Sequence, residues 1–342
     1  MYKYSIDLPS INKLSLGHAA SRFYRYFSAK CTFPVRVLFF GTDKFSLETL
    51  KKLNYGLRGG RILSRLDVVS SAKIKKSVIS QYCDSNGLQM LHWPIKRQLE
   101  GYDIGVVASF GHLIPEDIIK SFPLGMLNVH ASLLPRWRGA APVIYAVMNG
   151  DEETGVSIMR IMPKKFDIGD VLAQSRVAIG PHDTANEVTD KLAICGADLL
   201  IDCLENLPES LENAKPQSKD GITYAPKVKP SLAVIKWSET ETKKAYNLWR
   251  ALYGTLHLIT FWHGLQVKLI EACNCSFNSS SSSIQPGKVE YLKKQKIILV
   301  TCADGGKIGF QKIAIAGKKI MSAEDFYNGY MSKRNDSEWI FV

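Results

Sequence analysis

The chain has 342 residues, of which 46% are hydrophobic and 22% are charged. This is enough apolar material for a buried core, so the composition excludes a chain that is disordered throughout, and the length favours two domains. No stretch approaches the roughly 18 uninterrupted apolar residues of a membrane helix, so we expect a soluble protein with no membrane partner.

The net charge of +12 is unevenly distributed. Lys and Arg minus Asp and Glu give +4 for residues 1–33, −1 for residues 34–214 and +9 for residues 215–342. A basic region beside a neutral one is typical of a catalytic domain joined to a domain that binds a polyanion. The alternative is that the excess of lysine only aids solubility.

The first 33 residues have the composition of an organellar targeting segment. They are basic, poor in acids and rich in serine, with apolar residues at roughly helical spacing. The stretch Arg25–Ser28 resembles the arginine-guided sites at which matrix proteases cut, with cleavage between Phe27 and Ser28. The alternative is a disordered basic arm, and in either case we exclude this segment from the fold.

Residues 35–206 alternate between expected strands and helices. An apolar run at 35–40 ends at Gly41-Thr42, and an amphipathic helical pattern follows at once. Strand, glycine turn and helix open a doubly wound α/β domain with a mostly parallel, Rossmann-like sheet, whose ligands bind beyond the carboxyl ends of the strands. Further strands are predicted at Ile104–Ser109, Leu127–His130 and Val156–Met162, and helices at Pro115–Ser121, Ala141–Asn149 and Thr184–Leu204.

The alternation lapses near residues 205–230, where Pro, Ser, Asn and Lys indicate a linker. Beyond a helix at Glu239–Leu252, short alternating runs broken by turn residues predict a small, OB-like β-barrel. These runs are Leu258–Trp262, Gln266–Glu271, Gly287–Tyr291, Ile297–Thr301 and Lys307–Ile315. The serines at 278–283 indicate a low-complexity loop tip. We therefore divide the chain into a targeting segment (1–33), a catalytic domain (34–206), a linker (207–230), a barrel (231–334) and a tail (335–342).

The candidate catalytic and binding residues are concentrated between residues 102 and 170. Asn128 and His130 lie two apart on an apolar strand and share one face, although a lone histidine is more often a core residue bonded to a neighbour. The loop that follows carries Arg136-Trp137-Arg138, which suits binding an anion and stacking on a ring. The turn at 166–170 carries Asp167, which could reach His130. The seven scattered cysteines have no zinc-ligand spacing and indicate reduced thiols, so we expect no metal.

Several motifs resemble the methionyl-tRNA formyltransferase family in its mitochondrial form. The stretch NVHASLLPRWRGAAP at 128–142, far more selective than Asn-x-His alone, and FDIGD at 166–170 carry the resemblance. Residues 106–111 resemble the folate-site strand and turn of that family, 223–227 its interdomain stretch, and 317–326 the end of its barrel. The resemblance covers residues 35–330.

The resemblance implies an enzyme that transfers a formyl group from 10-formyltetrahydrofolate to the α-amine of initiator methionyl-tRNA. It also implies that the enzyme is a monomer and is located in the mitochondrial matrix. Asn128 and protonated His130 would stabilise the oxyanion, while Asp167 would hold the imidazolium and carry a proton through water. The implied folate contacts are Val107, Ala108, Ser109, Phe110, Gly111, Ser132, Leu133, Leu134 and Pro135. The expected tRNA contacts are Arg136, Arg138, Lys73, Lys75, Lys76, Lys227, Lys229, Lys243, Lys244, Arg250, Lys312, Lys318 and Lys319.

The sequence departs from the family pattern at three points. The basic loop after the second strand is short at residues 68–76 and lacks the Pro-Gly character of bacterial members. Ala131 replaces a glycine, and Met162–Phe166 replaces Gly-Leu and adds two lysines near the active site.

Three other functions are compatible with part of this pattern. A formyltransferase for a glycinamide nucleotide or an amino sugar would not need a separate basic barrel. A catalytically dead tRNA-binding homologue would not need Asn128, His130 and Asp167 intact. A formyl-folate hydrolase would use the same three residues on water but would not need Arg136, Arg138 or the barrel.

Overall fold

The structure is a computed structural model that describes residues 33–71, 77–95, 99–277 and 284–342, without the side chains of 274–277. Residues 1–32 of the predicted targeting segment therefore lie outside the described residues. The same is true of the serine run at 278–283 and of the expected tRNA contacts Lys73, Lys75 and Lys76.

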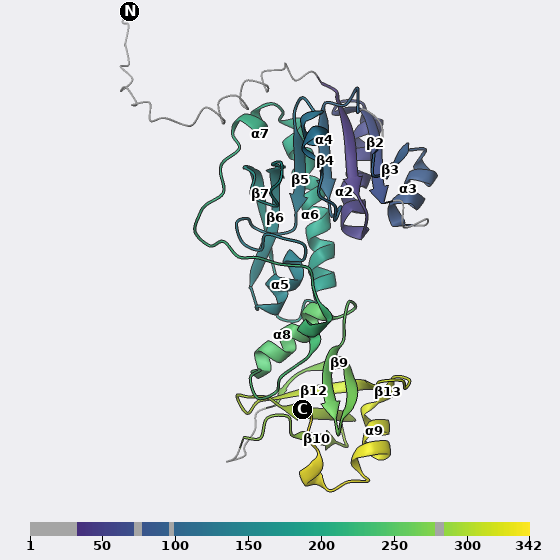
Figure 1. Ribbon diagram of the computed structural model, residues 1–342, viewed down its shortest axis with the longest axis vertical. Helices are drawn as coiled ribbons and strands as arrows, with labels where there is room; N and C mark the ends of the chain where they lie inside the picture. The colour runs from purple at the N-terminus through teal and green to yellow at the C-terminus, as the bar shows by residue number, and fades with distance from the viewer. Residues whose placement is uncertain (1–32, 72–76, 96–98, 278–283) are drawn as a thin grey trace, which may run out of the picture.

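Two sheets lie one beyond the other along the long axis of the molecule (Figure 1). The first has seven strands in the order β3-β2-β1-β4-β5-β6-β7. The neighbouring strands from β3 to β5 in this order pair in parallel, whereas β6 pairs antiparallel with both β5 and β7. This confirms the predicted doubly wound, mostly parallel sheet. The strands are β1 (Val35–Gly41), β2 (Leu63–Ser71), β3 (Met90–Trp93), β4 (Ile104–Ala108), β5 (Met126–His130), β6 (Glu153–Arg160) and β7 (Val171–Ala178).

Three of these strands, β2, β3 and β7, were not predicted from the sequence, and β2 includes residues 68–71 of the stretch that was expected to be a basic loop. In β2 the apolar run is interrupted by Arg65 and Asp67, which form an ion pair of 2.7 Å. The hydroxyl of Tyr102 also donates to Asp67 over 2.5 Å, so the buried carboxylate has partners that no sequence pattern shows. The β3 strand has only four residues, and β7 is a partly exposed edge strand.

Helices cover both faces of the first sheet. Because neighbouring residues of a strand point to opposite faces, Phe39 packs with α2 and α6, and Phe40 packs on the other face near α4. The long helices α2 (Lys44–Gly59) and α6 (Ala185–Glu205) each begin with a capping box, which satisfies free backbone N–H groups at the helix start. The shorter helices are α3 (Val78–Asn86), α4 (Glu116–Lys120), α5 (Pro142–Met148) and α7 (Glu209–Glu212).

The second sheet is antiparallel and curled into a half-barrel, in agreement with the predicted OB-like barrel. Its order is β10-β11-β12-β9-β8, with β13 paired to β12. The buried rings of Trp262, Phe310, Phe326 and Phe341 fill its core. The strands are β8 (Leu258–Trp262), β9 (Leu265–Phe277), β10 (Val289–Leu292), β11 (Ile297–Thr301), β12 (Lys307–Ile315) and β13 (Met321–Ser322). The flanking helices are α8 (Thr242–Leu252), α9 (Ala323–Phe326) and a π-helix (Tyr327–Met331), with 3-10 turns at Pro230–Ala233 and Asp336–Glu338.

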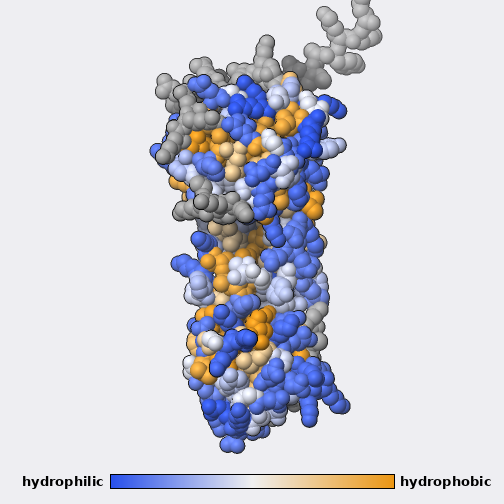
Figure 2. Space-filling view, turned by 90° about the vertical axis from the view of Figure 1, so that its right-hand side faces the viewer, coloured by the Kyte–Doolittle hydropathy of each residue, from blue (hydrophilic) through white to orange (hydrophobic). Residues whose placement is uncertain are grey.

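The two sheets meet at α8, which packs against α5 and α6 of the first half. The chain between α7 and α8 first runs along the outside of the seven-stranded half before it reaches the half-barrel (Figure 1). The face in Figure 2 is elongated, and hydrophilic side chains predominate at its half-barrel end.

Candidate active site

The strand β5 places Asn128 and His130 on one face of the seven-stranded sheet. They alternate with Leu127 and Val129, which are buried on the opposite face. His130 is only 5% exposed, whereas Asn128 is half-buried. A substrate approaching from the solvent therefore meets the amide of Asn128 before the imidazole.

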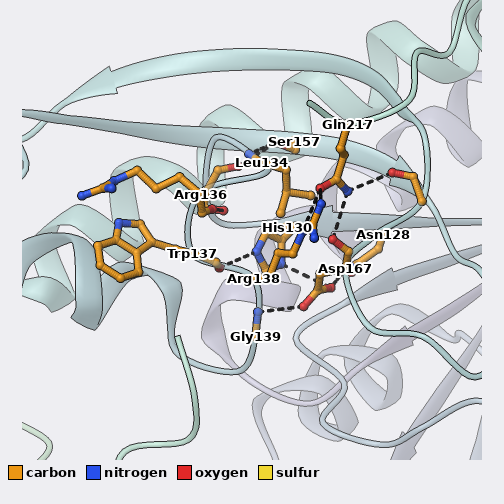
Figure 3. A network of polar contacts seen from close by, with 12 residues as sticks. Asn128, His130, Leu134, Arg136, Trp137, Arg138, Gly139, Ser157, Asp167 and Gln217 are labelled. Carbon is orange, nitrogen blue, oxygen red and sulfur yellow. Dashed lines mark hydrogen bonds and ion pairs between the residues drawn. The ribbon is translucent and has the colours of Figure 1, made fainter. Parts of the chain in front are cut away.

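Asp167 lies between these two side chains, although it is far from them in sequence (Figure 3). Its Oδ1 is 3.6 Å from Nδ1 of His130 and accepts a hydrogen bond of 3.3 Å from Nδ2 of Asn128. Its Oδ2 accepts a hydrogen bond of 2.9 Å from the backbone N–H of Gly139. The structure thus brings together the three residues whose joint action the sequence suggested.

The second ring nitrogen of His130 determines which protons the ring carries. Nε2 is 3.1 Å from the carbonyl oxygen of Trp137. A carbonyl oxygen can only accept, so Nε2 carries a hydrogen and donates it. Nδ1 then faces the carboxylate of Asp167, and a proton there gives an imidazolium paired with that carboxylate.

The turn that carries Asp167 has an unusual backbone. Asp167 has a φ of 51°, in the left-handed region that few residues other than glycine adopt. Gly169 approaches β6 so closely that a Cβ there would be 1.9 Å from the carbonyl oxygen of Arg160. Such strain persists only where surrounding contacts determine the conformation, and here it positions the carboxylate beneath His130.

Gln217 holds this turn from the segment between the two sheets. Its Nε2 donates to the carbonyl oxygens of Asp167 and Gly169, both over 2.9 Å. Its Oε1 accepts two hydrogen bonds from Arg138, of 3.0 Å from Nε and 2.7 Å from Nη2. Sequence reasoning missed Gln217 because Lys215–Ser218 has the composition of a linker. No local sequence pattern distinguishes a linker residue that bonds to the site from one that only connects two domains.

The segment 223–225 also belongs to the site. The N–H of Arg138 donates to the carbonyl oxygen of Thr223 over 2.9 Å, and the N–H of Ala225 donates to that of Arg138 over 2.7 Å. Gly139 packs against this segment, since a Cβ on it would be 2.5 Å from the carbonyl oxygen of Ala225. The loop after β5 is therefore held by chain that lies almost ninety residues further on.

Arg136 and Trp137 point away from the three central residues, whereas Arg138 points toward them (Figure 3). Arg136 makes a two-pronged ion pair with Asp151, with contacts of 2.8 and 2.6 Å, which raises the pKa of the guanidinium. The indole of Trp137 also donates to Asp151 and lies under the guanidinium of Arg136. Trp137 is 7% exposed, so the expectation that its ring is available for stacking is wrong.

The expected folate residues fall into two groups beside β5. In the first, Ala108 ends β4 next to Val129, and Ser109 bends away with a φ of 45°. Ser109 is exposed and its hydroxyl donates to Asp43, while Phe110 is buried against Phe40 and Gly111 is exposed. Val107 is buried within β4.

The second group is the loop at residues 132–135. Ser132 is fully buried and its hydroxyl donates to the carbonyl oxygen of Arg136 over 2.6 Å, so it shapes the loop. The N–H of Leu134 donates to the hydroxyl of Ser157, which is also bonded to Gln174. Leu134 and Pro135 line a cavity of about 370 Å³ that is also lined by Gln217, and Leu133 is half-buried.

The expected tRNA contacts of the second half differ in availability. Five lysines are exposed: Lys227, Lys229, Lys243, Lys318 and Lys319. Lys312 is also exposed, but its ammonium is 2.7 Å from Glu271, which raises its pKa. Lys244 is exposed and 3.4 Å from Glu241.

Arg250 is not a phosphate contact, and this expectation is wrong. It is 4% exposed, and burial lowers the pKa of its guanidinium. The guanidinium donates to the carbonyl oxygens of Gly180, Asp183 and Val147, all in the seven-stranded half, and to Asn247 on its own helix. Arg250 therefore fastens the two halves together.

Within the part of the chain that the structure describes, no group of three or more His, Cys, Asp or Glu side chains could hold a metal ion. Among its helices, none is long and apolar enough to cross a membrane.

Comparison with known proteins adds to this geometry. A family model described as formyl transferase matches residues 69–204, and one described as formyl transferase, C-terminal domain, matches residues 227–331. The chain is 43% identical to the human mitochondrial methionyl-tRNA formyltransferase over 87% of its own length and 78% of the relative. It is 31% identical to the methionyl-tRNA formyltransferase of Coxiella burnetii over 90% of its own length and 99% of the relative.

Solved structures share the fold. A sugar 3N-formyltransferase crystallised with dTDP and 5-N-formyl-THF superimposes with a TM-score of 0.60 at 17% identity, covering 84% of this chain and all of that one. HypX from Aquifex aeolicus, in complex with tetrahydrofolic acid, gives 0.57 at 15% identity, over 87% of this chain and 48% of that one. At these identities the likeness shows the fold alone.

Proposed function

The chain belongs to the methionyl-tRNA formyltransferase family, and from this premise we propose that it formylates methionyl-tRNA in mitochondria. The formyl donor is 10-formyltetrahydrofolate, the acceptor is the α-amine of methionine on the initiator tRNA, and the location is the matrix. The observation that carries the proposal is the meeting of Asn128, His130 and Asp167 at the carboxyl end of β5.

The reaction needs a site that stabilises a transient negative charge. Attack of the neutral amine on the formyl carbon forms a C–N bond and leaves an oxyanion on a tetrahedral carbon. Asn128 uses one amide hydrogen on Asp167, so its second hydrogen is available to this oxyanion. His130 adds positive charge beneath it when both ring nitrogens are protonated.

The second half of the reaction moves one proton. The bond from the tetrahedral carbon to the folate nitrogen breaks, and the proton lost by the amine must reach that nitrogen. Asp167, which lies beside Asn128, acts as the base, and a water molecule between carboxylate and substrate completes the transfer. No covalent bond to the protein forms, and the formyl group moves directly from nitrogen to nitrogen.

The two substrates approach from different elements in this proposal. The folate lies against the exposed residues Ser109 and Gly111, which follow β4, and against the loop at 133–135, next to the central three residues. The tRNA extends over the half-barrel, where the exposed lysines contact its phosphates. The catalytic domain of 34–206, the linker of 207–230 and a monomeric state belong to the same proposal. The barrel extends beyond residue 334, and the expected tail at 335–342 is wrong, because Phe341 is buried in the core of the half-barrel.

A direct assay tests the proposal. The protein is mixed with 10-formyltetrahydrofolate labelled in the formyl group and with initiator tRNA charged with methionine, and acid-stable formyl-methionine is measured after release from the tRNA. Free methionine, an amino sugar nucleotide and glycinamide ribonucleotide serve as competing acceptors. Labelling of any of these in preference to methionyl-tRNA, or release of free formate alone, would contradict the proposed function.

A further inference from the structure

Two exposed aromatic side chains border the site and have no part in the mechanism above. Phe166 is 64% exposed and Tyr224 is 67% exposed. Phe166 belongs to the stretch that departs from the family pattern, and Tyr224 belongs to the segment between the two halves. We call Phe166 and Tyr224 the aromatic pair.

Gly139 is the point at which the chain segments of the aromatic pair meet. Phe166 directly precedes Asp167, whose carboxylate accepts from the N–H of Gly139 over 2.9 Å. Tyr224 directly precedes Ala225, whose carbonyl oxygen would be 2.5 Å from a Cβ on Gly139. Each ring therefore belongs to a residue adjacent to one that contacts Gly139, although the two are far apart in sequence.

The backbone around Tyr224 is fixed while its ring is exposed. Tyr224 pairs with Arg138 in a parallel bridge, held by the hydrogen bonds of Thr223 and Ala225 to Arg138. Residues that pair directly across two strands carry their side chains on the same side. The side chain of Arg138 points to Gln217 and the Asp167 turn (Figure 3), so this pairing favours a Tyr224 ring on the same side as that arginine.

The charge around the aromatic pair favours an anionic occupant. Lys165 precedes Phe166, Lys227 follows Tyr224 by three residues, and both are exposed. Arg138 is half-buried and uses Nε and Nη2 on Gln217. Exposed rings beside cationic side chains are the usual means of binding unpaired nucleotides, since bases stack on the rings while the cations contact phosphates.

We propose that the aromatic pair is a stacking platform for the unpaired 3′-terminal nucleotides of the tRNA, with Lys165 beside their phosphates. The inference rests on the proposed function. Methionine is esterified to the terminal ribose, so when its amine reaches Asn128 the terminal nucleotide lies about one residue's length away. Trp137, the aromatic residue of the loop motif, is buried and cannot take this role.

Binding is tested with a tRNA that carries 2-aminopurine in place of its terminal adenine, because this base loses fluorescence when it stacks. The full-length protein should quench it. Phe166→Ala and Tyr224→Ala should each weaken binding about tenfold, and the double variant should abolish the quenching. Tyr224→Phe keeps the ring and should behave as the unaltered protein. Tyr55→Ala, which removes a 79% exposed ring on α2, is the matched control.

Steady-state kinetics of formylation are the second test of the inference. The KM for methionyl-tRNA should rise about tenfold in each alanine variant, while the KM for 10-formyltetrahydrofolate and the melting temperature stay unchanged. Unaltered quenching in the double variant, or a raised KM for the folate alone, would overturn the inference. The quenching assay needs no turnover, so it separates this inference from the proposed function, which fails if the unaltered protein does not formylate methionyl-tRNA.

Discussion

The carboxyl end of β5 and the outer surface of the half-barrel use polar groups in opposite ways. At β5 the imidazole of His130 is 5% exposed, and both its nitrogens face a specific partner. On the half-barrel, Lys318 and Lys319 extend from an exposed turn after β12. Chemistry on one carbon atom requires groups fixed within fractions of an ångström, whereas attraction of a polyanion requires only enough positive charge nearby.

This contrast predicts different responses to substitution. Removing one group from the fixed site should greatly lower the rate of formyl transfer and leave the binding of methionyl-tRNA intact. Removing one lysine from the surface should weaken binding slightly and leave the rate intact. Four groups of variants test the contrast.

The largest effect is expected from the central residues. His130→Ala, Asp167→Asn and Asn128→Ala should each lower kcat by on the order of 100-fold or more, because each acts on charge that develops during the reaction. The KM for methionyl-tRNA and the melting temperature should stay close to those of the unaltered protein. Single-turnover rates at saturating tRNA measure the effect.

Exposed groups of the same kind provide the controls for these variants. His92→Ala on β3 and Asp117→Asn on α4 should retain full activity, since both side chains are exposed. A kcat near the normal value in any of the three central variants would remove that residue from the mechanism.

Among the expected tRNA contacts in residues 215–342, Arg250 is buried and behaves like a residue of the fixed site. Arg250→Ala removes the hydrogen bonds of a buried guanidinium to carbonyl oxygens of the first half and should lower the free energy of unfolding by about 2 kcal/mol. Thermal unfolding checks this, with Lys243→Ala on the exposed side of α8 as the matched control. The salt dependence of tRNA binding should not change, and a flatter dependence in Arg250→Ala would show that the arginine contacts phosphate after all.

Gln217 tests whether the segment between the halves is part of the catalytic geometry. Gln217→Leu removes the two donors that hold the Asp167 turn and should lower kcat about tenfold, roughly 1.4 kcal/mol, with the KM for methionyl-tRNA unchanged. Gln311→Leu, on an exposed position of β12, is the control. An equal loss in kcat and in thermal stability across both variants would instead indicate a general packing defect.

The smallest effect is expected on the half-barrel surface. The double variant Lys318→Ala, Lys319→Ala should raise the KM for methionyl-tRNA several-fold and reduce the slope of log K against log salt by about 2, because each phosphate contact releases about one counterion. Lys312→Ala should change the slope less, since Glu271 already neutralises that lysine. Binding measured from low to moderate salt gives the slopes, and an unchanged slope in the double variant would exclude this pair from the tRNA surface.

Local features of the chain were sufficient to predict much of the fold. The strands at 258–262, 297–301 and 307–315 were predicted with the limits that the structure has, because each is an apolar run between turn residues. The pairing of β6 and β7 as antiparallel strands was not predicted. These strands are joined by residues 161–170, which include the Asp167 turn and Gly169 packed against β6.

The shared face of Asn128 and His130 was determined by the sequence itself, since a strand alternates its side chains whatever surrounds it. So was the division into a neutral half and a basic half, because charge is a property of composition. Only the tertiary structure decided which charges are available. It buried Arg250 and Trp137, brought Gln217 under Asp167, and left Phe166 and Tyr224 exposed beside Gly139. These outcomes depend on contacts between residues far apart in the chain, and burial and hydrogen bonding at such contacts have no local signature.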